Sequence, residues 1–187
     1  MSIQTWQETL ITGQGDGTAL TNTVTATSII PAAAKLLLPP NYFAIGKKFR
    51  IKSSGRISTF NTGPGTLTFE VRIGGVVAFT GGAMVLIATG MTNSTWELEI
   101  DLSCRAIGAG TGTTLLGTGR YVSRTVIGSG AAGSTGVGVL TLPDTAPVVG
   151  AGFDATVTNA LDLFATWSVA NAANSIQTHQ YSVEALN

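Results

Sequence analysis

The chain has 187 residues, the length of one domain, and its ten basic residues balance its ten acidic ones. A neutral total provides no overall field to attract nucleic acid or an anionic membrane. The single cysteine excludes an intramolecular disulfide framework, and no apolar stretch is long enough to span a bilayer. Only 11% of the residues are charged, against about 25% in typical domains, so Thr, Ser, Asn and Gly must form much of the surface. A surface of this kind can also be one that another protein covers.

Residues 1–35 allow two interpretations, an extended N-terminal arm or the first strand of the fold. An arm would carry the apolar side chains Ile3, Trp6, Leu10 and Ile11, which make sense on an arm if a partner buries them. Residues 19–29 are a further strand candidate. Residues 31–38 could form one or two helical turns, ended by two prolines.

From residue 36 onward the apolar side chains recur at every second position, the period of half-buried strands. Strands are predicted at residues 48–58, 66–73, 76–81, 95–106, 113–122, 136–142, 161–169 and 176–186. Gly63-Pro64-Gly65 and Gly74-Gly75 lie between such runs and predict turns, because glycine tolerates positive φ. The pattern predicts an all-β fold, a jelly-roll-like antiparallel β-sandwich that forms a single domain over residues 36–187.

The stretch TWELEIDLSCRA (95–106) shows the alternation most clearly, with Trp96, Leu98, Ile100, Leu102 and Cys104 on one face. Glu97, Glu99 and Asp101 lie on the other face, about 6.6–6.8 Å apart along the strand, a spacing that would also suit the carboxylates of an inverting glycosidase. The simpler interpretation is an outward polar face. Its carboxylates would pair with the basic stretch KKFRIK across neighbouring strands.

The other candidates for chemistry are better explained by structure. GSGAAG (128–133) has the G-x-G-x-x-G spacing but no helix pattern follows it, and GAGTGTT (108–114) and GQGDG (13–17) lack the lysine of a P-loop. His179 is the only histidine, expected on the same face as Gln177, Tyr181 and Val183, and Cys104 is expected to be a core thiol.

These residues predict no catalytic site, no cofactor and no metal site, because one histidine and one cysteine do not make a zinc site without several carboxylates. Lys47, Lys48, Arg50, Lys52 and Arg56 form the one basic cluster. With only Phe49 interleaved, the cluster does not predict nucleic-acid binding.

Several stretches occur in a recognisable order: PPNYFAIGKKFRIKSSGRIST, GPGTLTFEVRIGG, NSTWELEIDLSCRAIGAG, GRYVS and SIQTHQYSVEALN. This order resembles a family of tailed-bacteriophage virion proteins over residues 36–187. The resemblance implies a non-enzymatic structural protein of the capsid decoration, or cement, type. It also implies a homotrimer bound to the major capsid protein on the virion surface, made in the cytoplasm of the host bacterium.

Two other functions stay open at this point. One is a tail or baseplate component that binds the host surface. The other is a carbohydrate-active jelly roll that uses Glu97, Glu99 or Asp101.

Overall fold

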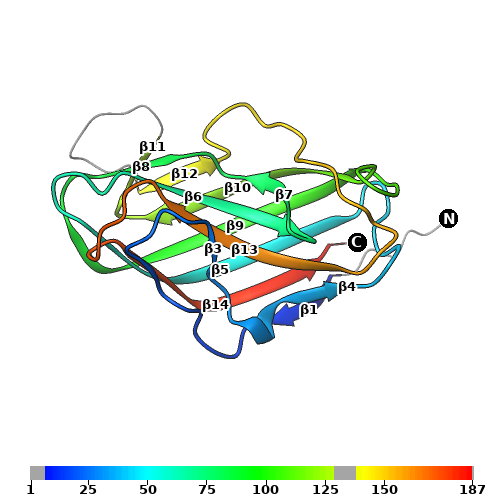
Figure 1. Cartoon of the computed structure of the whole chain (residues 1–187), viewed down its shortest axis with the longest axis horizontal. Coiled ribbons are helices and arrows are strands. Elements are labelled where there is room, and N and C mark those ends of the chain that lie inside the picture. Colours follow the sequence, from blue (N-terminus) through cyan, green and yellow to red (C-terminus); the bar gives the residue numbers. More distant parts are fainter. Residues whose placement is uncertain (1–6, 129–137, 187) are drawn as a thin grey trace.

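Two antiparallel sheets pack face to face in the computed structural model, which describes residues 7–128 and 138–186 (Figure 1). In spatial order, sheet A contains β1 (Glu8–Thr12), β14 (Ser175–Ala185), β5 (Lys48–Thr59), β9 (Met91–Ala106), β10 (Thr114–Ser123) and β12 (Val139–Leu142), with β2 (Leu20–Thr21) paired to β14. Sheet B contains β11 (Val126–Gly128), β8 (Met84–Leu86), β6 (Thr66–Ile73), β13 (Asn159–Trp167) and β3 (Thr27–Ser28), with β4 (Leu36–Leu38) on β13 and β7 (Val76–Thr80) on β6. The predicted fold class, an all-β sandwich, is confirmed.

Side-chain burial follows the predicted alternation. Every second residue of β6 is buried, and β9 buries Trp96, Leu98, Ile100, Leu102 and Cys104 as expected. The Gly74-Gly75 turn between β6 and β7 has positive φ at both glycines, and so do Gly63 and Gly65 before β6. The predicted Gly74-Gly75 turn is therefore confirmed, whereas Gly63-Pro64-Gly65 lies in the loop between β5 and β6, directly after a turn at Asn61 and Thr62.

Large aromatic side chains fill the space between the two sheets. Trp96 and Tyr121 of sheet A lie on Phe69 of sheet B, with ring centroids 5.7 and 5.3 Å from the Phe69 ring. The ring of Phe79, from β7, faces sheet A at Gly117, where a Cβ would lie only 2.2 Å from it. The missing side chain at Gly117 is what allows the two sheets to approach closely at this point.

The described part of the N-terminal segment runs along the sandwich. β1 pairs with β14, and Leu10 and Ile11 are half-buried against the core. Ile3 and Trp6 lie outside the described residues, so the predicted contact with a partner stays a prediction. The expected helical turns are a single 3-10 turn, η1 (Ala32–Ala34), followed directly by β4. Among the described residues, no helix is long and apolar enough to cross a membrane.

A β-bulge at His179 changes which side chains of β14 face inward. Thr178 pairs with Gly55 and Gln180 pairs with Ser54, so His179 is an extra residue with no partner on β5. Gln177 and His179 are half-exposed, whereas Tyr181 and Val183 are buried. The prediction that His179 shares a face with Tyr181 and Val183 is therefore wrong, because one inserted residue reverses the alternation.

The first strand, β1, begins at the same end of the sandwich at which the last strand, β14, ends, and we call this end the terminal pole (Figure 1). Glu8 pairs with Ala185 there. The loops at residues 39–47, 107–113 and 150–158 close this pole, joined by backbone hydrogen bonds from Gly46 to Cys104 and from Ala155 to Gly108. The rings of Phe43 and Phe153, 5.0 Å apart, plug the core beneath these loops.

Candidate functional site

Charged side chains cover the outward face of sheet A in an alternating pattern. In one row across the sheet, Arg120 of β10 lies opposite Glu99 of β9, which lies opposite Lys52 of β5. In the next row, Asp101 of β9 lies opposite Arg50 of β5, which lies opposite Glu184 of β14. The predicted pairing of the basic stretch with the acidic strand is confirmed.

Asp101 is firmly held by Arg50. The Nε and Nη2 groups of Arg50 donate to the two carboxylate oxygens of Asp101 at 2.7 and 2.8 Å. This bidentate hydrogen bond, with the nearby negative charges, raises the pKa of Arg50 above its ordinary value. Both oxygens of Asp101 are thus engaged within the protein.

Glu99 is held much more loosely than Asp101. Its carboxylate oxygens lie 3.9 Å from Nε of Arg50 and 4.0 Å from Nη2 of Arg120. Both distances exceed hydrogen-bonding range. Within residues 7–128 and 138–186, Glu99 accepts no side-chain hydrogen bond, so its lone pairs are open to solvent or to a ligand.

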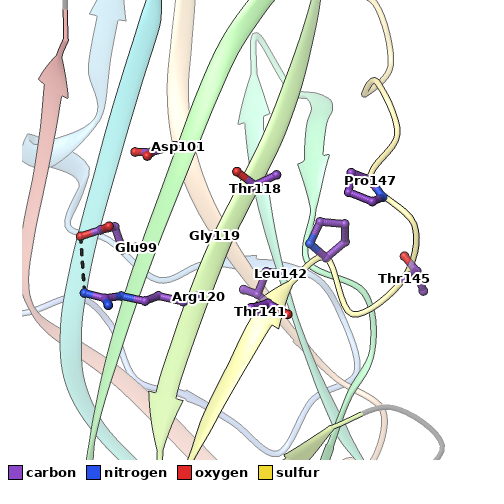
Figure 2. Close-up of a pocket in the computed structure, with 10 residues that line it drawn as sticks. Glu99, Asp101, Thr118, Gly119, Arg120, Thr141, Leu142, Thr145 and Pro147 are labelled. Atoms are coloured by element: carbon purple, nitrogen blue, oxygen red, sulfur yellow. Dashed lines mark ion pairs between the residues drawn. The ribbon is translucent and has the colours of Figure 1, made fainter.

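Glu99 and Arg120 lie in a hollow of 560 Å³ on this face (Figure 2). The floor is formed by β9, β10 and β12, and one wall is formed by the loop that follows β12. The lining residues are Glu99, Asp101, Thr118, Gly119, Arg120, Thr141, Leu142, Pro143, Thr145 and Pro147. The Arg120 side chain is 61% exposed and reaches from β10 across β9 toward Glu99.

The hollow offers hydrogen-bonding groups of both kinds. The guanidinium of Arg120 donates, the carboxylate of Glu99 accepts, and the hydroxyls of Thr118, Thr141 and Thr145 do both. None of the described residues that line it is aromatic. Among the described residues, no group of three His, Cys, Asp or Glu side chains is placed to hold a metal ion.

The three acidic residues of β9 do not all lie in the hollow. Glu99 and Asp101 line the hollow, whereas Glu97 does not and lies opposite Ser54 of β5. The carbohydrate-active hypothesis needed two of these carboxylates beside a substrate. Of the two in the hollow, Asp101 already accepts two hydrogen bonds from Arg50, whereas Glu99 accepts no side-chain hydrogen bond from the described residues.

The single histidine and the single cysteine lie away from this hollow. Nδ1 of His179 is 2.8 Å from Oδ1 of Asp16, in the GQGDG loop, and the backbone of Gly17 donates to Thr178 beside it. Cys104 is buried as expected, and burial raises the pKa of its thiol. His179 therefore fastens the N-terminal loop to the β14 bulge.

The predicted basic cluster is dispersed among partners. Lys47 lies over the ring of Tyr42, with Nζ 3.4 Å from the centroid, and Lys52 lies 3.4 Å from Glu184. Arg56 donates two hydrogen bonds to Gln177. Arg50 is held by Asp101 as described above, and Lys48 starts β5 opposite Ser103.

The glycine-rich stretches form loops where the structure describes them. Residues 108–113 belong to the loop between β9 and β10, with Thr113 bonded to the backbone of Gly108, and Thr114 begins β10. Residues 13–17 follow β1 alongside β14. GSGAAG lies outside the described residues apart from Gly128, which ends β11.

The sequence did not point to Arg120 or to the three threonines of the hollow. All four belong to stretches that alternate or turn, and nothing local distinguishes them from other surface residues. The weak signal available was the charge of Arg120 on the outward face of a predicted strand. Its position opposite Glu99 depends on which strands are neighbours.

Comparison with protein families and with curated proteins gives no match. Two solved structures are similar over almost the whole chain. One is the CBM2 module of the evolved Dit of Lactobacillus casei BL23 phage J-1, at 12% identity and a TM-score of 0.38, covering 99% of this chain and 98% of that one. The other is the winged bean acidic lectin complexed with methyl-alpha-D-galactose, at 10% identity and a TM-score of 0.29, covering 98% and 99%. At TM-scores this low, neither likeness assigns the chain to a family or a function.

Proposed function

We propose that the chain is a structural protein of a bacteriophage virion that decorates the assembled capsid. It binds the major capsid protein as a homotrimer and stabilises the shell. The proposal combines the order of sequence stretches, which resembles phage virion proteins, with a fold whose surface suits adhesion. No catalytic residue or cofactor is part of it.

The observation that carries the proposal is a set of exposed apolar side chains at the terminal pole. Ile45 is 70% exposed, Leu37 66%, and Ile107 and Val157 each 50%. Ile45 and Ile107 flank the segments joined by the hydrogen bond from Gly46 to Cys104, and Val157 lies in the loop at residues 150–158. Among the described residues, the exposed Leu and Ile side chains all belong to this set, whereas five exposed valines lie elsewhere. Large aliphatic side chains at one end of a weakly charged protein suit a surface that a partner covers.

Burial of these side chains would provide enough free energy for binding to a partner. Burial of one Leu, Ile or Val side chain contributes about 1.5–3 kcal/mol before the costs of association. Four such side chains per chain give a modest affinity. Three copies in one trimer would increase the overall affinity greatly through avidity.

The first experiment measures how many copies each virion contains. Purified virions should contain hundreds of copies, quantified on a stained gel against the major capsid band, and light scattering of the free protein should give the mass of three 19.1 kDa chains. A few copies per virion, with antibodies that label the tail, would contradict the proposal and favour a tail or baseplate component.

The second experiment tests the terminal pole directly. The double variant Ile45→Asp with Ile107→Asp should fail to bind heads that were assembled without the protein. Heads mixed with this variant should therefore rupture more readily on heating than heads that carry the wild-type protein. Val24→Asp is the matched control, because Val24 is also exposed, at 53%, but lies between β2 and β3 at the opposite pole. Equal binding of the double variant and the control would show that the pole is not the contact surface.

A further inference from the structure

We propose that the hollow around Glu99 and Arg120 binds a neutral saccharide. This site is separate from the terminal pole and does not depend on capsid binding. The hollow lies on the outward face of sheet A, whereas the pole is formed by the loops at residues 39–47, 107–113 and 150–158.

Two neighbouring groups in the hollow, Glu99 and Arg120, have unused hydrogen-bonding capacity. The carboxylate oxygens of Glu99 lie 3.9 Å from Arg50 and 4.0 Å from Arg120, too far for a hydrogen bond. The Arg120 side chain is mostly exposed, and its contact with Glu99 is its one ion pair among the described residues. The hollow thus places a strong acceptor beside a strong donor, and no hydrogen bond within residues 7–128 and 138–186 satisfies either of them.

The charges in the hollow are balanced, which favours a ligand without net charge. The carboxylates of Glu99 and Asp101 face the guanidiniums of Arg50 and Arg120, so the local charges cancel. An anion attracted by Arg120 would also meet Glu99, and a cation attracted by Glu99 would meet Arg120. A vicinal diol satisfies both groups at once, because each hydroxyl donates to the carboxylate or accepts from the guanidinium.

The rim of the hollow combines hydroxyl groups with apolar surface. The hydroxyls of Thr118, Thr141 and Thr145 add groups that can both donate and accept. Pro143 and Pro147 on the wall present apolar surface for the C–H groups of a sugar ring. The volume of 560 Å³ falls within the range of small-molecule sites, roughly 300–1,000 Å³.

The site is suited to binding rather than to cleavage. Hydrolysis with two carboxylates requires both to act on the substrate or on water. Asp101 uses both oxygens to hold Arg50. The expected ligand is therefore a sugar unit held through its hydroxyls, with the rest of a longer glycan free to leave the open side of the hollow.

The test uses the isolated full-length protein and a panel of neutral methyl glycosides, including those of glucose, galactose, mannose and N-acetylglucosamine. Backbone amide shifts are followed during titration to millimolar concentrations. At least one glycoside should shift the amides of residues 99–101, 118–120, 141, 142, 144 and 145 and leave those of the terminal pole unchanged. Arg120→Ala should weaken this binding about tenfold or more, since hydrogen bonds to a charged group are lost.

Arg105→Ala is the matched control, because Arg105 is an exposed arginine of β9 that does not line the hollow, and it should keep the wild-type affinity. Glu99→Gln preserves the shape of the side chain and should also weaken binding, which provides a second variant should Arg120→Ala disturb the fold. Three results would overturn the proposal: no glycoside shifts the amides of the hollow, phosphate or acetate shifts them instead, or both variants bind like the wild type.

Discussion

The two faces of β9 have the same backbone but opposite relations to their surroundings. Trp96, Leu98 and Ile100 point inward and are at most 2% exposed, whereas Glu99 and Asp101 point outward and their side chains are 30% and 40% exposed. Inward side chains fit against a second sheet, where any change of volume alters many contacts. Outward side chains interact in pairs, which water can replace. The inward face should therefore determine stability, and the outward face should be free to determine what the protein binds.

The largest effect is expected from Trp96→Ala. Trp96 is fully buried, packs on Phe69, and donates from its indole nitrogen to the backbone of Arg56 at 3.1 Å. Its removal should lower the free energy of unfolding by about 3–5 kcal/mol, measured by urea denaturation. Glu97→Ala, one position away on the outward face, is the control and should change it by less than about 0.5 kcal/mol. Similar losses in the two variants would show that the faces do not differ as argued.

A smaller effect is expected from adding one methyl group at Gly117. The new Cβ would lie 2.2 Å from the ring of Phe79 and 2.9 Å from Leu102, so the sheets must separate locally or Phe79 must move. Gly117→Ala should destabilise the protein by about 1–3 kcal/mol, visible as a lower melting temperature. Thr118→Ala changes the next residue on the outward face and should have little effect. An unchanged melting temperature in Gly117→Ala would mean that the sheets are not closely packed there.

The smallest effect is expected from the ion pair on the outward face. A double-mutant cycle of Arg50→Ala and Asp101→Ala should give a coupling energy of about 0.2–1 kcal/mol, because both side chains are partly exposed and water replaces their contact. High salt should reduce this coupling. A coupling as large as the loss expected for Trp96→Ala would mean that the charged face, too, holds the fold together.

Much of the fold could be predicted from residue types alone. The alternation in β6 and β9 gave their inward side chains correctly, because successive side chains of any strand point to opposite faces. Cys104 was placed in the core for the same reason. The prediction failed at His179, where a bulge adds one residue to β14, and no local pattern marks that insertion.

Less of the candidate site could be predicted. Glu99 and Asp101 were recognised as outward carboxylates, and their pairing with the basic stretch followed from opposite charges on two predicted strands. Arg120 and Thr141 were missed, because their position beside Glu99 depends on β10 and β12 following β9 in sheet A. The wall of the hollow, with Pro143 and Pro147, depends on where the loop after β12 runs.

The sequence by itself determined that this chain forms strands, which side chains of most strands enter the core, and that its charges are balanced. These properties are local, since they follow from backbone geometry and from the type of each side chain. Only the tertiary structure decided that β14 lies between β1 and β5, that β1 begins and β14 ends at one pole, and that Glu99 and Arg120 share a hollow. These properties arise from contacts between residues far apart in the chain, where packing and loop paths select one strand order among many with the same alternation.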